Sequence, residues 1–218
     1  MDNIQRKLLI KKDKKAKQIV NFSSLVDETS IIFSGKKDDD FIIKIKDALM
    51  DSLSLTRKIS KDILKMEGLS GRKYRSLINS LVYKVKNPSY LEIGSWLGST
   101  ACSAVFKNNL TITCIDNWSQ VFFEKEFPNP EKIFKANIKK YLGKGSKYSF
   151  INNDFRKIDF SSIGKHNIYL FDGPHHFEDH FDGIIIAQPA LTEKFILIID
   201  DWNWDQVRNG TISALKHL

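Results

Sequence analysis

The sequence predicts an α/β protein in which a helical N-terminal extension precedes a doubly wound parallel sheet. Five short apolar runs between residues 90 and 200 alternate with helix-like stretches. Each run is apolar at consecutive positions, which is typical of strands buried on both faces of a parallel sheet. The alternation favours parallel strands joined by right-handed crossovers. A hydrophobic content of 42% and a charged content of 28% fit a globular protein rather than a disordered one.

The first 80 residues differ in character from the rest. We expect a basic arm and a helical extension over residues 1–80, and a ligand-binding sheet domain over residues 81–218. Residues 30–34 could form a short strand. Apolar side chains then recur at helical spacing in three stretches, namely residues 43–55, 59–66 and 77–82.

The second region supplies the strands and helices of the sheet domain. The predicted strands are residues 90–94, 111–116, 148–152, 167–172 and 195–200, and the predicted helices between them are residues 99–107, 130–141 and 177–191. The second, fourth and fifth runs end in aspartate. Ligands of open parallel sheets bind outside the carboxyl ends of the strands, so these acids stand where chemistry is expected.

The charge of the chain is concentrated near its start. The formal net charge is +8, and residues 6–17 hold seven Lys or Arg against one Asp. Such an arm is either a solvated tail or a contact for phosphates or a membrane surface. No run is long enough for a membrane span or a signal peptide. Cys102 and Cys114 lie in segments that are predicted to be buried, so we expect a reducing, cytoplasmic compartment and no disulfide or zinc site.

The first predicted strand runs into a loop with two glycines. Gly94 permits a tight turn, Gly98 permits close backbone approach, and Ser99 or Thr100 can cap the next helix. Asp116 ends the second strand, 22 residues after Gly94. A carboxylate there suits hydrogen bonds to the ribose hydroxyls of an adenosine-containing cofactor. A structural turn with an acid that caps a loop is the alternative interpretation.

Residues 90–100 resemble the first motif of class I S-adenosylmethionine-dependent methyltransferases, E-x-G-x-x-x-G, in which Glu92 matches the acid. Asp154, after Asn153, resembles the segment that binds adenine. The resemblance implies a Rossmann-like fold with strand order 3-2-1-4-5 and S-adenosylmethionine as cofactor. The absence of G-x-G-x-x-G disfavours a nicotinamide dehydrogenase. The expected cofactor-binding residues are Glu92, Gly94, Ser95, Trp96, Gly98, Ser99, Asp116, Asn117, Trp118, Asp154 and Asp172.

Acidic and imidazole side chains follow the last two predicted strands. Asp172 ends the fourth strand and is followed by His175 and His176, and Asp200 and Asp201 end the fifth. Three neighbouring carboxylates cannot remain ionised together without a cation. Oxygen ligands suit Mg²⁺ or another divalent cation, which could hold two substrate oxygens and lower the pKa of an acceptor hydroxyl. Acids that cap loops and bind lysines are the alternative.

This pattern is similar to that of metal-dependent O-methyltransferases of the catechol and macrocin types. The similarity implies that Asp172, Asp200 and Asp201 hold the metal ion and that a small hydroxylated acceptor, such as a sugar or a catechol, is methylated. The sequence has His175 where the catechol type has lysine, and proline two residues after Asp172, where the macrocin type has an acid. His175 or His176 is therefore the expected base, although an imidazole could also be a ligand of a softer metal.

Three further questions stay open in the sequence. Trp96, Trp118, Trp202 and Trp204 follow strand ends and either wall the site or cover the loops. Only a helix is predicted after the fifth strand, so the usual C-terminal hairpin is expected to be missing. Either the chain is truncated, or the segment around residues 30–33 covers the open edge, or a second subunit of a homo-oligomer does so. The alternative functions are a nucleic-acid or protein methyltransferase guided by the basic arm, and a non-catalytic binding module with the same fold.

Overall fold

The computed structural model describes residues 31–54, 59–120 and 122–218 of the chain. Lys36–Leu218 form one compact unit, which carries all the helices and strands of the described residues. Residues 31–34 form no strand, so the prediction of a short strand over residues 30–34 is wrong for its described part. The basic segment at residues 6–17 lies outside the described residues.

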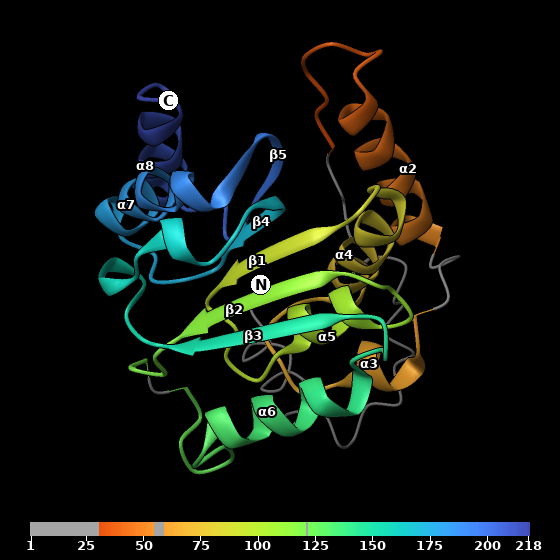
Figure 1. Ribbon diagram of the computed structural model, residues 1–218, viewed down its shortest axis with the longest axis vertical. Coiled ribbons are helices and arrows are strands. Elements are labelled where there is room, and N and C mark those ends of the chain that lie inside the picture. The colour runs from red at the N-terminus through yellow and green to blue at the C-terminus, as the bar shows by residue number, and fades with distance from the viewer. Residues whose placement is uncertain (1–30, 55–58, 121) are drawn as a thin grey trace, which may run out of the picture. The chain divides into compact units, whose positions relative to one another are not determined.

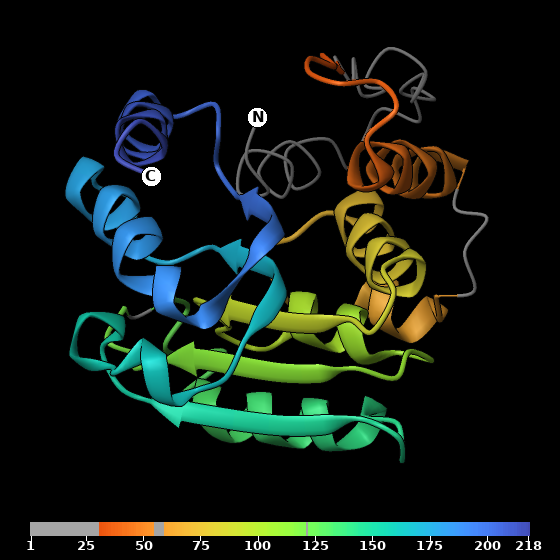
Figure 2. The same ribbon diagram turned by 45° about the horizontal axis from the view of Figure 1, so that its top comes forward.

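Five parallel strands form the single sheet of this unit, in the order β3-β2-β1-β4-β5. The predicted sheet and its strand order are therefore confirmed. Figures 1 and 2 show β1, β2 and β3 side by side, with their arrowheads at the same edge. The strands are β1 (Ser89–Ile93), β2 (Thr111–Asp116), β3 (Lys147–Asn152), β4 (His166–Phe171) and β5 (Leu191–Ile199).

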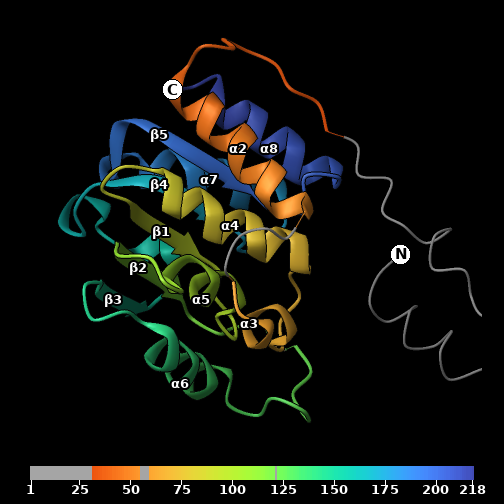
Figure 3. The same cartoon turned by 90° about the vertical axis from the view of Figure 1, so that its right-hand side faces the viewer.

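Helices cover both faces of the sheet. Tyr90 of β1 packs with helices on one face, whereas Leu91 and Ile93 pack in a second core on the other, as the two-residue period of a strand requires. Figure 3 shows α2, α4, α5 and α6 along one side of the sheet. The helices are α2 (Asp40–Ser54), α3 (Lys61–Lys65), α4 (Arg72–Lys84), α5 (Ser99–Val105), α6 (Pro130–Tyr141), α7 (Phe177–Ala187) and α8 (Asp205–Leu215).

The start of β5 differs from the prediction. Helix α7 ends at Ala187, where a 3₁₀ turn (Gln188–Ala190) with Pro189 follows, and β5 begins at Leu191. Proline has no N–H to continue the helical hydrogen bonds, which is why the helix stops before residue 191. The first half of β5 contains three polar residues, Thr192, Glu193 and Lys194, and the last two of them are exposed. This part of the strand therefore lacks the apolar run from which the other strands were predicted.

Residues 36–80 of the predicted extension lie in the same compact unit as the sheet. Helix α4 crosses the boundary that was predicted at residue 80, and α2 packs against α4. Within the described residues, β5 pairs with β4 alone and no hairpin strand follows it, as expected. No described helix has both the length and the apolar character needed to cross a membrane.

Candidate active site

A cavity of about 520 Å³ lies at the carboxyl edge of the sheet. The segments that follow all five strands line it, and residues 69–71 and Tyr74 from the extension line it as well. Its volume falls within the range of small-molecule sites, roughly 300–1,000 Å³. Its position is the one at which open parallel sheets bind ligands.

The glycines of the first loop allow close backbone packing. Gly94 has φ +89°, and a Cβ atom there would lie 1.9 Å from the carbonyl oxygen of Asp172. Gly98 has φ +84°, and a Cβ atom would lie 2.8 Å from Cδ2 of Phe134. Gly94 lines the cavity, whereas Gly98 does not. Gly98 thus packs closely against Phe134, and its contact with the cofactor stays a prediction.

Asp116 joins the two loops that border one end of the cavity. Its Oδ2 accepts a hydrogen bond from the backbone N–H of Trp96 at 2.8 Å, and its Oδ1 accepts one from the N–H of Trp118 at 2.7 Å. Both tryptophans have left-handed backbone angles, with φ of 42° and 48°, so the carboxylate stabilises an unfavourable conformation. Each carboxylate oxygen keeps a second lone pair. Asp116 can therefore still accept a ligand hydroxyl.

The four tryptophans have different surroundings. Trp118 packs against the rings of Phe134 and Phe150, whose centroids lie 5.8 and 5.1 Å away, so this side chain covers the core. Trp202 and Trp204 are each 45% exposed, and the ring of Trp204 lies 5.1 Å from that of His175. Trp96 lines the cavity and packs against Phe122, Phe123 and Phe127.

Glu92 lies beneath the first loop and not in the cavity. It is fully buried, and its Oε2 accepts a hydrogen bond from the hydroxyl of Tyr90 at 2.7 Å. Burial raises the pKa of Glu92 to about 7, and the hydrogen bond from Tyr90 partly opposes this rise. Glu92 is not among the residues that line the cavity, and its contact with the cofactor stays a prediction. Its carboxyl group supports the loop from within the core.

The other predicted cofactor residues do line the cavity, namely Gly94, Ser95, Trp96, Ser99, Asp116, Asn117, Trp118, Asp154 and Asp172. Asp154 follows β3, and its Oδ1 accepts a hydrogen bond from the N–H of Arg156 at 3.0 Å. Sequence reasoning missed Ser70, Tyr74 and Arg156, which also line the cavity. Ser70 lies in the loop before α4 and Tyr74 in α4 itself, and Arg156 follows β3. None of the three belongs to a sequence motif that distinguishes it from an ordinary surface residue.

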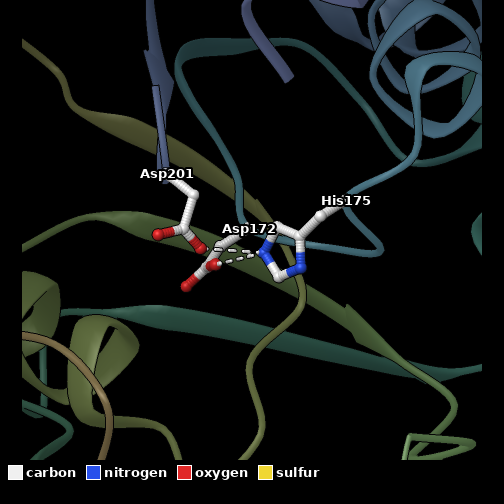
Figure 4. Close-up of side chains that lie close together, drawn as sticks. All are labelled: Asp172, His175 and Asp201. Carbon is white, nitrogen blue, oxygen red and sulfur yellow. Dashed lines mark ion pairs between the residues drawn. The ribbon is translucent and has the colours of Figure 1, made fainter. Parts of the chain in front are cut away.

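Asp172, His175 and Asp201 meet at the other end of the cavity, and Figure 4 shows both carboxylates directed at the imidazole ring. Nε2 of His175 lies 3.0 Å from Oδ2 of Asp201 and 4.0 Å from Oδ1 of Asp172. One ligand atom from each residue lies within 4.8 Å of the other two. Asp201 has φ +49°, a left-handed backbone angle of the kind that concentrates at functional sites.

The carboxylates of this end are crowded. Burial raises the pKa of Asp172 well above its usual range, and the neighbouring Asp200 raises it further. His175 lowers the pKa of Asp201 by donating a hydrogen bond and by its charge. Among the described residues, no lysine or arginine forms an ion pair with Asp172, Asp200 or Asp201. A cation would relieve this repulsion, and two oxygens with one nitrogen form a plausible donor set.

Two predicted residues take other positions. Oδ1 of Asp200 accepts the N–H of Asp201 at 3.0 Å, and Asp200 lines the cavity without joining the three-residue cluster. His176 is exposed, does not line the cavity, and is the N-cap residue of α7. Its backbone N–H donates to Oδ2 of Asp179 at 3.0 Å. His175 and not His176 therefore lines the cavity, and the role of either histidine as a base stays a prediction.

A parallel sheet of this order, with a cofactor-sized cavity over a glycine turn and an acid that ends β2, defines the class I methyltransferase type of Rossmann-like protein. A family model described as "Methyltransferase domain" matches residues 91–202, more than half of the 218 residues. The chain belongs to this family. A search of curated proteins finds no match.

Solved structures share the fold at low sequence identity. A Streptococcus mutans protein described as a SAM-dependent methyltransferase has a TM-score of 0.53 and 14% identity, over 68% of this chain and 40% of that chain. Cofactor-bound Rv0187 from MTB has a TM-score of 0.52 and 10% identity, over 90% of this chain and 83% of that chain. This chain therefore spans well under half the length of the Streptococcus protein. At these identities the likeness concerns the fold.

Proposed function

We propose that the protein transfers a methyl group from S-adenosylmethionine to a hydroxyl oxygen of a small acceptor, with the help of a divalent cation. The observation that carries this proposal is the cluster of Asp172, His175 and Asp201 in the same cavity as Gly94 and Asp116. The bound cofactor would supply a methyl group on a positively charged sulfur, open to displacement by an oxygen nucleophile. The residues of the chain would bind, align and deprotonate the reactants.

The cofactor end supports the proposal through its hydrogen-bonding capacity. Both oxygens of Asp116 keep a lone pair for the ribose hydroxyls after binding the two loop N–H groups. Gly94 lines the cavity, and because it has no side chain the first loop can pack against the backbone of Asp172. Asp154, after β3, lines the wall that we assign to the adenine.

The acceptor end supports the proposal through its donor set. Asp172 and Asp201 would hold the cation through carboxylate oxygens, with Asp200 beside them in the cavity wall. A cation there would lower the pKa of an acceptor hydroxyl. His175 would take the hydroxyl proton, and Asp201, whose Oδ2 lies 3.0 Å from Nε2 of the same ring, would stabilise the imidazolium. The alternative is that His175 is itself a ligand of the cation and not the base.

Three variants distinguish these roles. His175→Gln should lower turnover by about 10²–10⁴-fold, the usual contribution of a general base, while the affinity for Mn²⁺ stays close to wild type. Asp172→Asn should lose the affinity for Mn²⁺ and the turnover that depends on it, with cofactor affinity nearly intact. His176→Ala is the matched control and should keep turnover, since His176 is exposed outside the cavity.

The measurements are methyl transfer to a panel of hydroxylated acceptors, with Mg²⁺ or with chelator, and calorimetric titration with Mn²⁺. If His175→Gln loses metal affinity as well, then His175 is a ligand and not the base. Equal turnover of Asp172→Asn with and without chelator, at the wild-type rate, would contradict the role of the cation.

A further inference from the structure

A buried arginine of the extension lies beside the cavity without a carboxylate partner. Arg75 of α4 is 2% exposed. It forms no ion pair with an Asp or Glu among the described residues. A buried charge that lacks an opposite charge is costly, so its remaining contacts must offset the loss of water. Burial lowers the pKa of Arg75, and the negative charge of Glu67, which is too far away for an ion pair, partly opposes this shift.

The contacts of Arg75 are all with uncharged oxygens. Nη1 donates to the backbone carbonyls of Ile63 at 2.8 Å and Met66 at 2.6 Å, at the end of α3. Nε donates to the hydroxyl of Ser70 at 2.9 Å. The guanidinium is therefore held by carbonyl dipoles on one side and directs a hydrogen bond toward the cavity wall on the other.

The hydrogen bond from Arg75 continues to a second hydroxyl. Oγ of Ser70 lies 2.8 Å from Oγ of Ser99, and both serines line the cavity. Ser70 accepts from Arg75, so its own proton is free to donate to Ser99. The proton of Ser99 is then free to donate to a ligand. A chain of hydrogen bonds that begins at a cation polarises each donor in turn, which favours an anionic acceptor at its end.

Gly68 allows the side chains of Arg75 and Ser99 to pack closely against the backbone before α4. It has φ +156°, and a Cβ atom there would lie 2.5 Å from Oγ of Ser99 and 2.9 Å from Nη2 of Arg75. The segment before α4 therefore packs directly on the first loop because residue 68 has no side chain. This segment and Arg75 lie outside residues 91–202, the part that the family model matches.

We propose that Ser99 and Ser70, polarised by Arg75, form a subsite for the carboxylate of the cofactor's amino-acid end, an inference that rests on the proposed function. The acceptor end already holds the carboxylates of Asp172, Asp200 and Asp201 and would repel another anion. Ser99 instead is the first residue of α5, directly after the loop that begins at Gly94, at the end of the cavity that we assign to the cofactor. The extension then contributes directly to cofactor recognition, with Arg75 as a positioning residue.

The test compares two ligands that differ only in the carboxylate. S-adenosylmethionine and its decarboxylated form are titrated into the full chain by calorimetry. Wild type should bind the carboxylate-bearing ligand more tightly, and Ser70→Ala should reduce this ratio about tenfold or more, as the loss of a charge-assisted hydrogen bond would. Ser70→Thr keeps the hydroxyl and should restore the ratio. Ser119→Ala, a cavity serine beside Asn117, should leave the ratio unchanged.

The outcomes separate the subsite from the function on which it rests. Equal weakening of both ligands in Ser70→Ala would assign Ser70 a purely structural role and overturn the subsite. An unchanged ratio in Ser70→Ala would overturn it as well. Wild type that binds neither ligand would contradict the proposed function itself.

Discussion

Several cavity side chains stabilise the backbone around them as well as facing a ligand. Asp116 binds two backbone N–H groups from loops with left-handed tryptophans, and Gly94 makes room for the end of β4. Glu92 only stabilises the backbone, because its carboxyl group is fully buried and supports the loop without reaching the cavity.

The buried carboxyl of Glu92 should make stability depend on pH. Its pKa is about 7 in the folded chain and close to its ordinary value of 4.5 when unfolded. The folded state therefore holds a proton that the unfolded state releases, and stability falls as pH rises through this window. Relative to Glu92→Gln, wild type should lose about 2–3 kcal/mol of unfolding free energy between pH 5 and pH 8.

Urea unfolding of both proteins at the two pH values measures this difference. Groups that titrate alike in wild type and variant cancel in the comparison. A difference between the two proteins that does not change with pH would show that Glu92 is ionised in the folded chain at pH 5.

At the scale of elements, the start of α7 fixes the direction of the loop that carries His175. Asp179, in the first turn of α7, accepts the N–H of His176 through Oδ2, and its Oδ1 lies 2.7 Å from Nη2 of Arg156. Arg156 follows β3, so the two contacts tie the beginning of α7 to the segment after β3 that lines the cavity.

Asp179→Ala should therefore destabilise the protein by about 1–2 kcal/mol, because a buried cap and an ion pair are lost together. Asp182→Ala is the matched control: Asp182 also pairs with Arg156, at 2.9 Å, but its side chain is 39% exposed. Its loss should cost about 0.5 kcal/mol or less. The unfolding free energies of the two variants are compared with that of wild type. Equal losses would mean that the cap contributes nothing.

At the scale of the whole molecule, the sequence predicted the sheet because buried parallel strands are apolar at consecutive positions. The order of the strand ends and the glycine turn then indicated the cofactor end of the cavity. The start of β5 escaped prediction because Thr192, Glu193 and Lys194 are polar. Ser70 and Arg75 escaped it because their role depends on how α4 packs on the first loop, and no local pattern encodes that packing.

The acceptor end was predicted in its residue types but not in its pairing. Asp172, Asp200 and Asp201 were expected to group together, and all three line the cavity, but the three-residue cluster with ligand atoms within 4.8 Å contains His175 and not Asp200. Side-chain direction decides this, since Asp201 has a left-handed backbone and Asp200 accepts the next N–H. Neither feature can be read from residue types and spacing.

The central claim is that this cavity binds S-adenosylmethionine, and calorimetric titration of the full chain tests it most directly. S-adenosylmethionine and S-adenosylhomocysteine are titrated with Mg²⁺ and with chelator, and NAD serves as the control ligand. We predict micromolar binding of both sulfur compounds and none of NAD, since the dinucleotide motif G-x-G-x-x-G is absent. No binding of either sulfur compound under any condition would contradict the account.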